Sequence, residues 1–501
     1  MPLPSIRPPP MVLAVLVVLI LVGAGLYAAS LRKEEKGGGG GPTWSTPFDE
    51  EFGNVRVTVG GKHADRNTNE PYIAMDPDDP NHMVAAGNDY STPKGDVWVG
   101  YYWTFDGGRT WNRSFIPGYF GDTRPDGLLS PLNVYGPAGG TGDPVVAFGP
   151  GGEVYIAGIA FQRSMVGPNT IWVARSDDGG RTFPWDQIYT DIIIGEGVAA
   201  FHDKEWIAVD PNNGNVYITW SWFTGLSTAQ IAFSRSTNGG QTWSPVKFIS
   251  ETLNMEIGVQ GSQVVVDSQG RIHVTWIDFD RNVLRYTWSD DEGDAWGGPV
   301  DVCEVDPIPY NLNNGTYRTP TLPSMKVGTS GTASDGTLYV TWNDQRDGDA
   351  DVYMVRSTDR GKTWDRPFRV NQDDRGNSRD QFFPTLTVTP RGEVVVAYYD
   401  RREDPHNTLL DMYMSVSLDR GDNFTDIRIT TASFDGNAGG GSPLGQATGG
   451  DAFIGDYIGA VSSDSLAYAI WCDCRNGGPQ PEYRDSDLYV GRIVLDRLGG
   501  D

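Results

Sequence analysis

Arginine and aspartate recur at short spacing in the middle of the sequence, where Arg318 is followed by Asp344, Arg346 and Asp351. A guanidinium fork binds a carboxylate through two parallel hydrogen bonds. A carboxyl group can donate a proton to the leaving oxygen of a glycoside. This stretch therefore contains residue types that can bind a carboxylate and transfer a proton.

The Asp-x-Arg spacing at Asp344 and Arg346 is not confined to one place in the chain. It recurs as Asp400-Arg401-Arg402 and Asp473-Cys474-Arg475. An aspartate that opens the next expected strand also recurs, at Asp96, Asp351, Asp411 and Asp487. Repeated residues of this kind also serve as salt bridges between repeats or as turn hydrogen bonds. The sequence leaves a catalytic and a structural interpretation open for them.

A short element of the form Ser/Thr-x-Asp-x-Gly-x-Thr-Trp divides the chain into repeats. The residues above lie within these repeats. Its six copies are spaced 53 to 72 residues apart, and their third residues are Asp106, Asp178, Asn238, Asp291, Asp359 and Asp419. The aspartate carboxylate can accept backbone N–H groups within a hairpin turn, and glycine supplies the positive φ that such a turn requires. We interpret these positions as structural, and the spacing suits a four-stranded sheet with its turns.

A second repeated element consists of an apolar strand, a Gly/Asp turn and another apolar strand. It occurs seven times, beginning near residues 72, 144, 206, 263, 321, 384 and 457. The seventh copy is followed by only one further strand, 487–494, before the chain ends. A four-stranded seventh sheet then needs a strand from elsewhere, and we expect residues 54–59 to supply it and to close a ring.

The six boxes resemble those of the sialidase superfamily, also called Asp-box or BNR-repeat proteins, over roughly residues 54–495. The resemblance implies an all-β propeller. Counting the second element predicts seven blades, whereas sialidases of this superfamily commonly have six, so a six-bladed propeller is the alternative. The expected order is a tail over 1–10, an apolar segment over 11–30, a Gly-rich linker over 31–53, the propeller over 54–495 and a tail over 496–501.

The resemblance also implies roles for particular residues. Tyr317-Arg318-Thr319-Pro320 resembles a family motif whose arginine belongs to a triad that grips the substrate carboxylate, and the Asp-x-Arg that follows resembles the motif that supplies a second arginine. Asp349 or Asp351 stands where the family has its acid/base. The family also has a Tyr–Glu nucleophile pair, for which Tyr457 and Glu205 are the candidates.

The expected strand order brings two classes of loop to one face of the propeller, the loops before each first strand and those after each second strand. The candidate catalytic residues on this face are Asp344, Asp351, Glu205 and Tyr457. The candidate substrate-binding residues are Arg318, Arg346, Arg379 and Arg402.

Composition narrows the classes of partner. The formal net charge is −26, which repels nucleic acid and disfavours docking on anionic lipid.

Three cysteines, Cys303, Cys472 and Cys474, form neither a disulfide scaffold nor a zinc site. We expect no cofactor and no catalytic metal. The Asp-rich turns at 76–79 and 210–213 could hold structural Ca²⁺, although such residues are also ordinary turn formers.

Residues 11–30 form an uncharged apolar run long enough to span a bilayer as a helix. The run is longer than a usual signal sequence, which favours a retained anchor, and a cleaved signal is the alternative. We expect the propeller to lie outside the cell. The sequence thus predicts a membrane-anchored, monomeric sialidase-like propeller that acts on acidic glycans, or a non-catalytic propeller that binds a glycan or glycoprotein at the cell surface.

Overall fold

The computed structural model describes residues 46–59, 67–92, 97–137, 139–163, 168–190, 200–224, 228–251, 253–254, 258–328, 331–440, 452–478 and 484–499. The expected anchor, residues 11–30, lies outside this part of the chain. Among the described residues, no helix has the length and apolar character needed to cross a bilayer.

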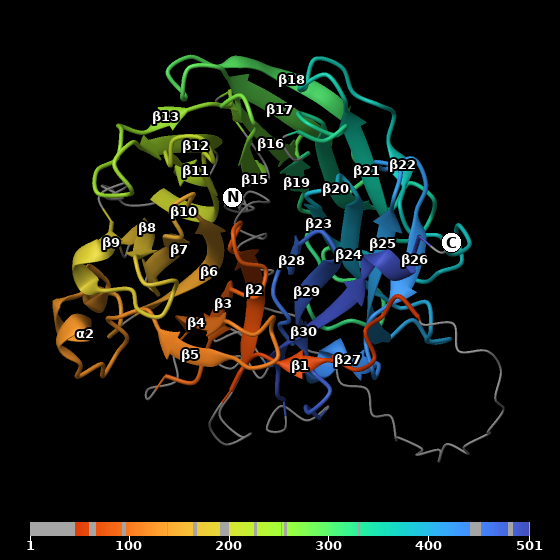
Figure 1. Cartoon of the computed structure of the whole chain (residues 1–501), viewed down its shortest axis with the longest axis horizontal. Helices are drawn as coiled ribbons and strands as arrows, with labels where there is room; N and C mark the ends of the chain where they lie inside the picture. The colour runs from red at the N-terminus through yellow and green to blue at the C-terminus, as the bar shows by residue number, and fades with distance from the viewer. Residues whose placement is uncertain are drawn as a thin grey trace, which may run out of the picture.

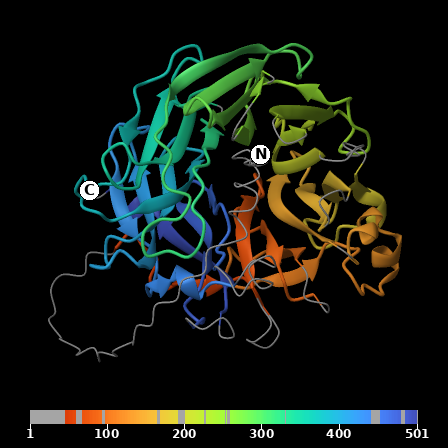
Figure 2. The same cartoon turned by 180° about the vertical axis from the view of Figure 1, so that it is seen from behind.

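Seven antiparallel sheets follow one another around a central axis and form a propeller. The colours in Figure 1 run around the ring in chain order, so that the first strands lie beside the last. Figure 2 shows the same ring from behind. The structure confirms the all-β seven-bladed prediction and excludes the six-bladed alternative.

The first four blades each begin with their innermost strand. Blade one contains β2 (Thr68–Met75), β3 (Met83–Asp89), β4 (Trp98–Thr104) and β5 (Asn112–Phe115). Blade two contains β6 (Gly139–Phe148), β7 (Val154–Gln162), β8 (Asn169–Ser176) and β9 (Ile188–Tyr189). Blade three contains β10 (Ala200–Val209), β11 (Val216–Thr224), β12 (Thr228–Ser236), β13 (Lys247–Phe248) and β14 (Leu253–Asn254). Blade four contains β15 (Val259–Val266), β16 (Ile272–Asp278), β17 (Val283–Ser289) and β18 (Gly297–Glu304).

The remaining blades follow the same plan. Blade five contains β19 (Ser324–Val327), β20 (Leu338–Asp344), β21 (Asp351–Ser357) and β22 (Phe368–Arg369). Blade six contains β23 (Gln381–Val388), β24 (Val394–Asp400), β25 (Leu409–Ser417), β26 (Thr425–Arg428) and β27 (Phe434–Asp435). Blade seven contains β28 (Gly459–Ser462), β29 (Leu466–Asp473), β30 (Asp487–Val494) and β1 (Val55–Arg56). The described helices are short, namely α2 (Pro125–Leu129), η2 (Pro131–Val134), η3 (Trp185–Gln187), η4 (Gly436–Ala438) and η6 (Leu495–Arg497).

The first strand of the chain closes the ring. Val55 and Arg56 of β1 pair antiparallel with Val490 and Tyr489 of β30, so the closing strand predicted at 54–59 is confirmed. The residues just before it also pack on blade seven, where Asp49 forms a 2.8 Å ion pair with Arg492. Closure covers part of the outer edge of β30 and joins the two ends of the propeller within one sheet.

Large aromatic side chains fill the spaces between blades. The second strands contribute Trp220, Trp276, Trp342 and Trp471, each almost completely buried. Successive side chains of these strands point to opposite faces of the sheet, and a neighbouring blade covers each face. This explains why the strands are apolar along most of their length.

The six boxes form tight turns at the ends of the third strands. In blade two, Asp178 Oδ1 accepts hydrogen bonds from the backbone N–H of Thr182 at 2.9 Å and from the Ser176 hydroxyl at 2.7 Å. In blade three, Asn238 Oδ1 accepts the equivalent backbone bond from Thr242 at 2.9 Å, and the Asn238 amide donates to the Thr242 hydroxyl. Asparagine therefore preserves the turn, because the threonine hydroxyl can accept as well as donate.

Replacing Asp178 by alanine should lower the free energy of unfolding by about 1–2 kcal/mol, because the substitution leaves several turn donors without their acceptor. Asn238→Asp is the matched control and should change stability by less than about 0.5 kcal/mol, since aspartate already fills this position in blade two. Chemical denaturation of both variants measures the difference. Equal stabilities would mean that the box carboxylate does not hold the turn.

Five innermost strands carry a β-bulge near the same end. The register shifts between Asn69 and Tyr72 in β2, and at the equivalent places in β6, β10, β15 and β23. The first bulge residues have positive φ values of 50° to 72°, and they are Glu70, Asp143, Lys204, Gly261 and Phe383. Bulges re-aim side chains, and left-handed non-glycine residues gather at functional sites. The bulges therefore mark one mouth of the central channel as the place to look for chemistry.

Candidate functional site

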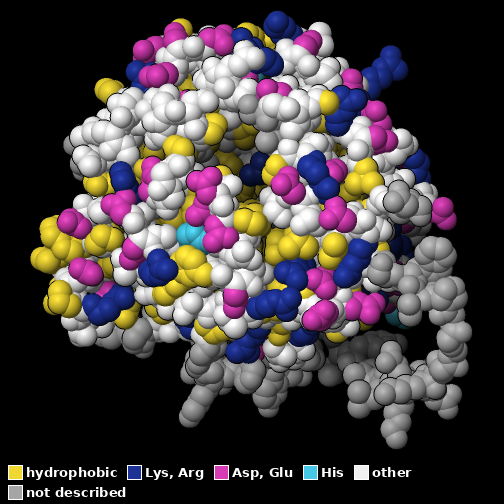
Figure 3. Space-filling view, in the orientation of Figure 1, with side chains coloured by type: hydrophobic (Ala, Val, Ile, Leu, Met, Phe, Trp, Pro, Cys, Tyr) yellow, Lys and Arg dark blue, Asp and Glu magenta, His cyan; other side chains and the backbone are white. Residues whose placement is uncertain are grey.

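A pocket at the mouth of the channel is built from these bulges. Its lining residues come from blades two to seven, and they are Asp143, Lys204, Glu205, Trp206, Gly261, Ser262, Gln263, Pro320, Leu322, Pro323, Ser324, Asn343, Phe383, Pro384, Thr385, Asp456, Tyr457 and Ile458. One side is charged and the other is apolar. In the space-filling view the centre of the molecule is hollowed, with hydrophobic side chains inside and charged side chains around it (Figure 3).

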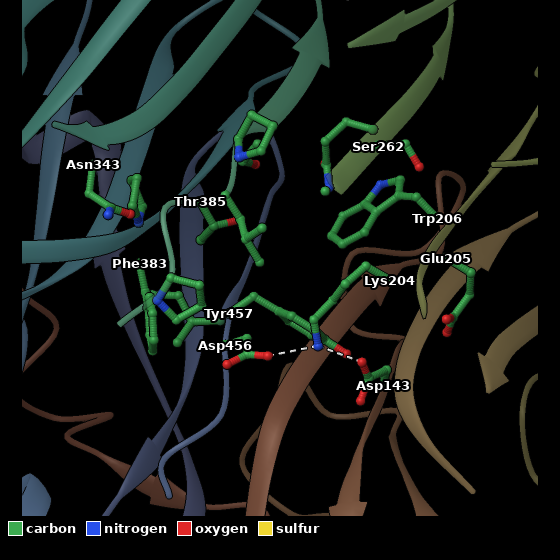
Figure 4. Close-up of a pocket in the computed structure, with 18 residues that line it drawn as sticks. Asp143, Lys204, Glu205, Trp206, Ser262, Asn343, Phe383, Thr385, Asp456 and Tyr457 are labelled. Atoms are coloured by element: carbon green, nitrogen blue, oxygen red, sulfur yellow. Dashed lines mark hydrogen bonds and ion pairs between the residues drawn. The ribbon is translucent and has the colours of Figure 1, made fainter. Parts of the chain in front are cut away.

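Lys204 lies at the centre of the charged side. Its ammonium group is 2.5 Å from Asp143 Oδ2, 2.8 Å from Asp456 Oδ2 and 3.5 Å from Glu70 Oε1. Figure 4 shows Asp143 and Asp456 on opposite sides of this group. Burial disfavours the charged lysine, but Asp143, Asp456 and Glu70 together raise its pKa well above the usual value. Lys204 is therefore a fixed positive charge and not a nucleophile.

Arg318 holds Asp456 from the other side. The guanidinium donates from Nε to Asp456 Oδ1 at 2.6 Å and from Nη2 to Asp456 Oδ2 at 2.5 Å. It also lies over the Phe453 ring, 4.7 Å from the centroid. Burial would raise the pKa of Asp456, but Arg318 and Lys204 reverse that effect and hold the pKa below its ordinary value. Asp456 is thus ionised at neutral pH.

The pKa of Glu205, next to Lys204 on β10, is shifted in the opposite direction. The residue is 1% exposed, and neither carboxyl oxygen has a hydrogen-bond partner among the described residues. Burial, followed by the charge of Asp143, raises the pKa of Glu205 well above its ordinary value. Burial likewise raises the pKa of Asp203, which accepts a 2.7 Å hydrogen bond from Gln260, to about 6. The pocket therefore holds a carboxyl group whose pKa is raised beside one whose pKa is lowered.

Aromatic rings form the floor of the pocket. Trp206 packs edge-to-face against Tyr72 at 4.8 Å and against Tyr457 at 6.1 Å between centroids. The Tyr457 hydroxyl donates to the carbonyl of Pro144 at 3.1 Å, and burial raises its pKa well above the ordinary value. Beyond this floor, the inner strands and Lys326 line an open cavity of about 310 Å³ in the channel.

Two of the sequence-predicted arginines bind aspartates of their own blades. Arg346 donates to both oxygens of Asp344 at 2.7 and 2.6 Å, and Asp344 also accepts from Trp342 Nε1 at 2.8 Å. Arg402 donates from Nε to Asp400 Oδ2 at 2.8 Å, and its Nη2 lies 2.6 Å from the same oxygen. Arg475 forks onto Asp473 in blade seven. A geometry that recurs in three blades belongs to the blade frame, and Arg346 and Arg402 do not line the pocket.

Asp351 also has counterparts in other blades. Its Oδ1 accepts a 2.8 Å hydrogen bond from Asn371, beside Arg369. Asp411 is held by Thr430 and Arg428 in blade six, and Asp487 by Thr58 and Arg56 in blade seven. Each of these aspartates opens a third strand and fastens the outer strand to it. Burial raises the pKa of Asp351 to about 6, but it does not line the pocket.

Replacing Asp344 by asparagine should destabilise the protein by about 2–4 kcal/mol, because a buried charge pair loses one partner. It should leave ligand binding at the channel mouth unchanged. Thermal unfolding and ligand titration separate the two effects. A variant of normal stability that has lost binding would place Asp344 in the site.

The structure thus brings together Arg318, Glu205 and Tyr457 from the sequence-based set, and it adds Glu70 and Asp143. Arg379, just before β23, donates through its backbone N–H to Asp349 and does not line the pocket. Glu70 and Asp143 were missed because their strands were expected to begin one or two residues later. The signal that could have found them is the proline that follows each, since proline in a strand marks a bulge.

No metal centre is present in the described part of the chain, where no three His, Cys, Asp or Glu residues are grouped as metal ligands. The carboxylates of the Asp-rich turns make local hydrogen bonds instead. Asp76 accepts from the Asp78 N–H and contacts His82, and Asp210 accepts from Asn212. The three cysteines are free thiols.

Comparisons with known proteins give structural neighbours and no sequence match. No family model and no curated protein sequence matches the chain. The fold is similar to that of sialidases. A Hadza microbial sialidase is 14% identical over 83% of this chain and 73% of its own, with a TM-score of 0.44. The NanB sialidase of Streptococcus pneumoniae is 12% identical over 90% and 71%, with a TM-score of 0.41.

A further similar structure is an ulvan lyase, a polysaccharide lyase that is 11% identical over 87% of this chain and 96% of its own, with a TM-score of 0.48. These similarities concern the fold. The seven-bladed assignment itself rests on the strand pairings described above.

Proposed function

We propose that the protein acts on glycans and cleaves a glycosidic bond at the mouth of the propeller channel. The observation that carries the proposal is that one pocket holds Glu205, buried without a hydrogen-bond partner and with a raised pKa, and Asp456, held by two cations and with a lowered pKa. Environments that drive two carboxyl pKa values apart assign an acid and a base. Glycosidases use such a pair on the two sides of the scissile bond.

In this proposal Glu205 donates its proton to the glycosidic oxygen as the bond to the leaving group breaks. Asp456 and Asp143 stabilise the positive charge that develops at the anomeric carbon. A water molecule then adds to that carbon, and the proton that it loses returns to Glu205. Trp206 offers an apolar face to the sugar ring. Lys204 and Arg318 are positioning residues, because they keep Asp456 ionised and fixed.

A second candidate function is non-catalytic binding of a glycan or a protein. The observation that favours it is that both cations of the pocket are already occupied by carboxylates. A binding propeller needs the rim and the aromatic floor but no proton donor. The test must therefore measure binding and turnover separately.

The test uses the full-length chain and a panel of fluorogenic glycosides that includes a sialoside. The wild type should turn over at least one member, and Glu205→Gln should lose this activity. Glu51→Gln, an exposed residue outside the pocket, is the matched control. Binding on a glycan array without turnover of any glycoside would replace hydrolysis by the binding function. Turnover of the sialoside would support the expected acidic substrate.

We further propose that residues 11–30 hold the propeller at the outer surface of a membrane. The support is the length and the uncharged apolar character of that run. The protein should sediment with membranes, and protease added to intact cells should remove the propeller. A propeller found only in the medium would indicate a cleaved signal.

A further inference from the structure

Carboxyl groups outnumber cations at the channel mouth. Five carboxyl groups, those of Glu70, Asp143, Asp203, Glu205 and Asp456, surround Lys204 and Arg318. Both cations already have partners. The Arg318 guanidinium donates two hydrogen bonds to Asp456, and the Lys204 ammonium group contacts three carboxylates. A ligand carboxylate entering this pocket meets the carboxyl groups of Asp143 and Asp456 and no vacant guanidinium fork among the described lining residues.

The environment of Glu205 provides a second, independent observation. It lines the pocket, it is almost completely buried, and both of its oxygens are without a hydrogen-bond partner in the described structure. A buried carboxyl group without partners costs free energy, which a donor from a ligand would recover. Because Asp143 is close enough to act on Glu205 electrostatically, a positively charged donor suits this place better than a neutral one.

The other side of the pocket is apolar. Leu322, Phe383 and Pro384 also line the pocket. In Figure 4 the Trp206 ring lies above the Lys204 ammonium group, on the side opposite Phe383. A ligand that fits carries a cationic group at one end and an apolar face at the other. A hexose with a free amine has both, since the ring C–H groups pack on an indole face and the amine is protonated at neutral pH.

We propose that the pocket recognises an amino sugar, a hexosamine unit with a free protonated amine, whose ammonium group lies against Glu205 and Asp143 and whose ring packs on Trp206. The inference rests on the proposed function only in taking the ligand to be a glycan, and it holds for a binding propeller as well as for a hydrolase. It directs the preference toward basic and away from acidic glycans.

Binding of an ammonium group should also release a proton. The charged and titratable groups that face Glu205 are Asp143 from β6, Asp203 and Lys204 from β10, and Tyr457 before β28. Lys204 and Asp143 already neutralise each other at 2.5 Å. The incoming cation therefore stabilises the ionised form of Glu205, and the carboxyl proton leaves to solvent.

The experiment titrates the full-length protein with the β-1,4-linked glucosamine trimer, with its N-acetylated counterpart and with sialyllactose, in 150 mM salt at pH 7. The glucosamine trimer should bind about tenfold or more tightly than the N-acetylated trimer, and sialyllactose should bind most weakly. Calorimetry in two buffers of different ionisation enthalpy should detect the released proton. This comparison needs no variant and is unaffected if a substitution impairs folding.

Glu205→Gln should remove the preference for the amine, so that the two trimers bind with equal affinity. Glu51→Gln is the matched control for long-range attraction to an acidic protein, because it removes one exposed charge outside the pocket. It should preserve the preference. Equal loss in both variants would assign the preference to net charge and overturn the site.

Three further results would overturn the inference: equal affinity for the two trimers, tighter binding of sialyllactose, or binding of trilysine as tight as that of the glucosamine trimer. The last would assign the pocket to a basic peptide. These outcomes are separate from those of the proposed function. Amine-selective binding without turnover would refute hydrolysis alone, and turnover of neutral or acidic glycosides without amine selectivity would refute this inference alone.

Discussion

Replacing Lys204 by methionine should destabilise the propeller by about 3–5 kcal/mol, because it leaves buried carboxylates without their central cation. Asp143, Asp456 and Glu70 come from three different blades and meet at this ammonium group. Methionine fills a similar volume, so the loss measures charge rather than packing. Chemical denaturation at pH 7 gives the difference.

Lys247→Met is the matched control. Lys247 also contacts an aspartate, Asp294 at 3.3 Å, but both side chains are well exposed, and the substitution should cost less than about 1 kcal/mol. Lowering the pH should restore part of the stability of Lys204→Met alone. Burial raises the pKa of Glu70 and Lys204 lowers it. Without the lysine that pKa rises further in the folded state, so stability is lost as pH rises through it and regained below it. Equal destabilisation by the two substitutions would mean that the charge of Lys204 does not stabilise the carboxyl groups at the channel mouth.

The architecture could be predicted because its determinants are local and repeated. Each box contains its own acceptor, donor and glycine, as at Asp178 and Thr182, so the turn can be recognised without knowledge of distant contacts. Closure by β1 followed from counting strands, since the seventh repeat lacked one. The actual partner, β30, lies more than 400 residues away in the chain, and only the rule that sheet edges must be covered connects the two.

The site could be predicted only in part, because its residues are defined by exceptions to the strand pattern. Lys204, Asp143 and Glu70 face the channel mouth because a bulge turns each of them out of the ladder. A bulge adds one residue and leaves the apolar alternation around it intact, so the sequence pattern hardly changes. Glu205 and Tyr457 were found only through the expected loop positions.

Sequence motifs were less informative where they were most conspicuous. The Asp-x-Arg pairs attract attention as carboxylate-binding groups, yet Arg346 and Arg402 use their forks within the blade. An arginine that faces a buried aspartate two residues earlier can make the same two hydrogen bonds as an arginine that binds the carboxylate of a ligand. Residue type and spacing therefore do not separate the two uses, and the three-dimensional partner does.

The pH dependence of glycoside turnover should be asymmetric, with high activity in acid and a loss as pH rises. Glu205 acts in its protonated form, and burial raises its pKa above the ordinary value of a glutamic acid, so activity falls as pH rises through that raised pKa. Asp456 acts in its ionised form, and its pKa lies below the ordinary value, so activity persists as pH is lowered. Initial rates between pH 3 and pH 9, about the range over which such groups titrate, test this profile.

Glu205→Gln should lower turnover of a glycoside with a poor leaving group by about 10²–10⁴-fold. It should affect a dinitrophenyl glycoside much less, because that leaving group departs without a proton. The descending limb at high pH should disappear for the variant, since glutamine does not titrate. A residue that only supported the fold would reduce both substrates equally and leave the shape of the profile unchanged. A profile unaltered by Glu205→Gln would transfer the proton-donor role to Asp203, whose pKa of about 6 makes it the next candidate on the same strand.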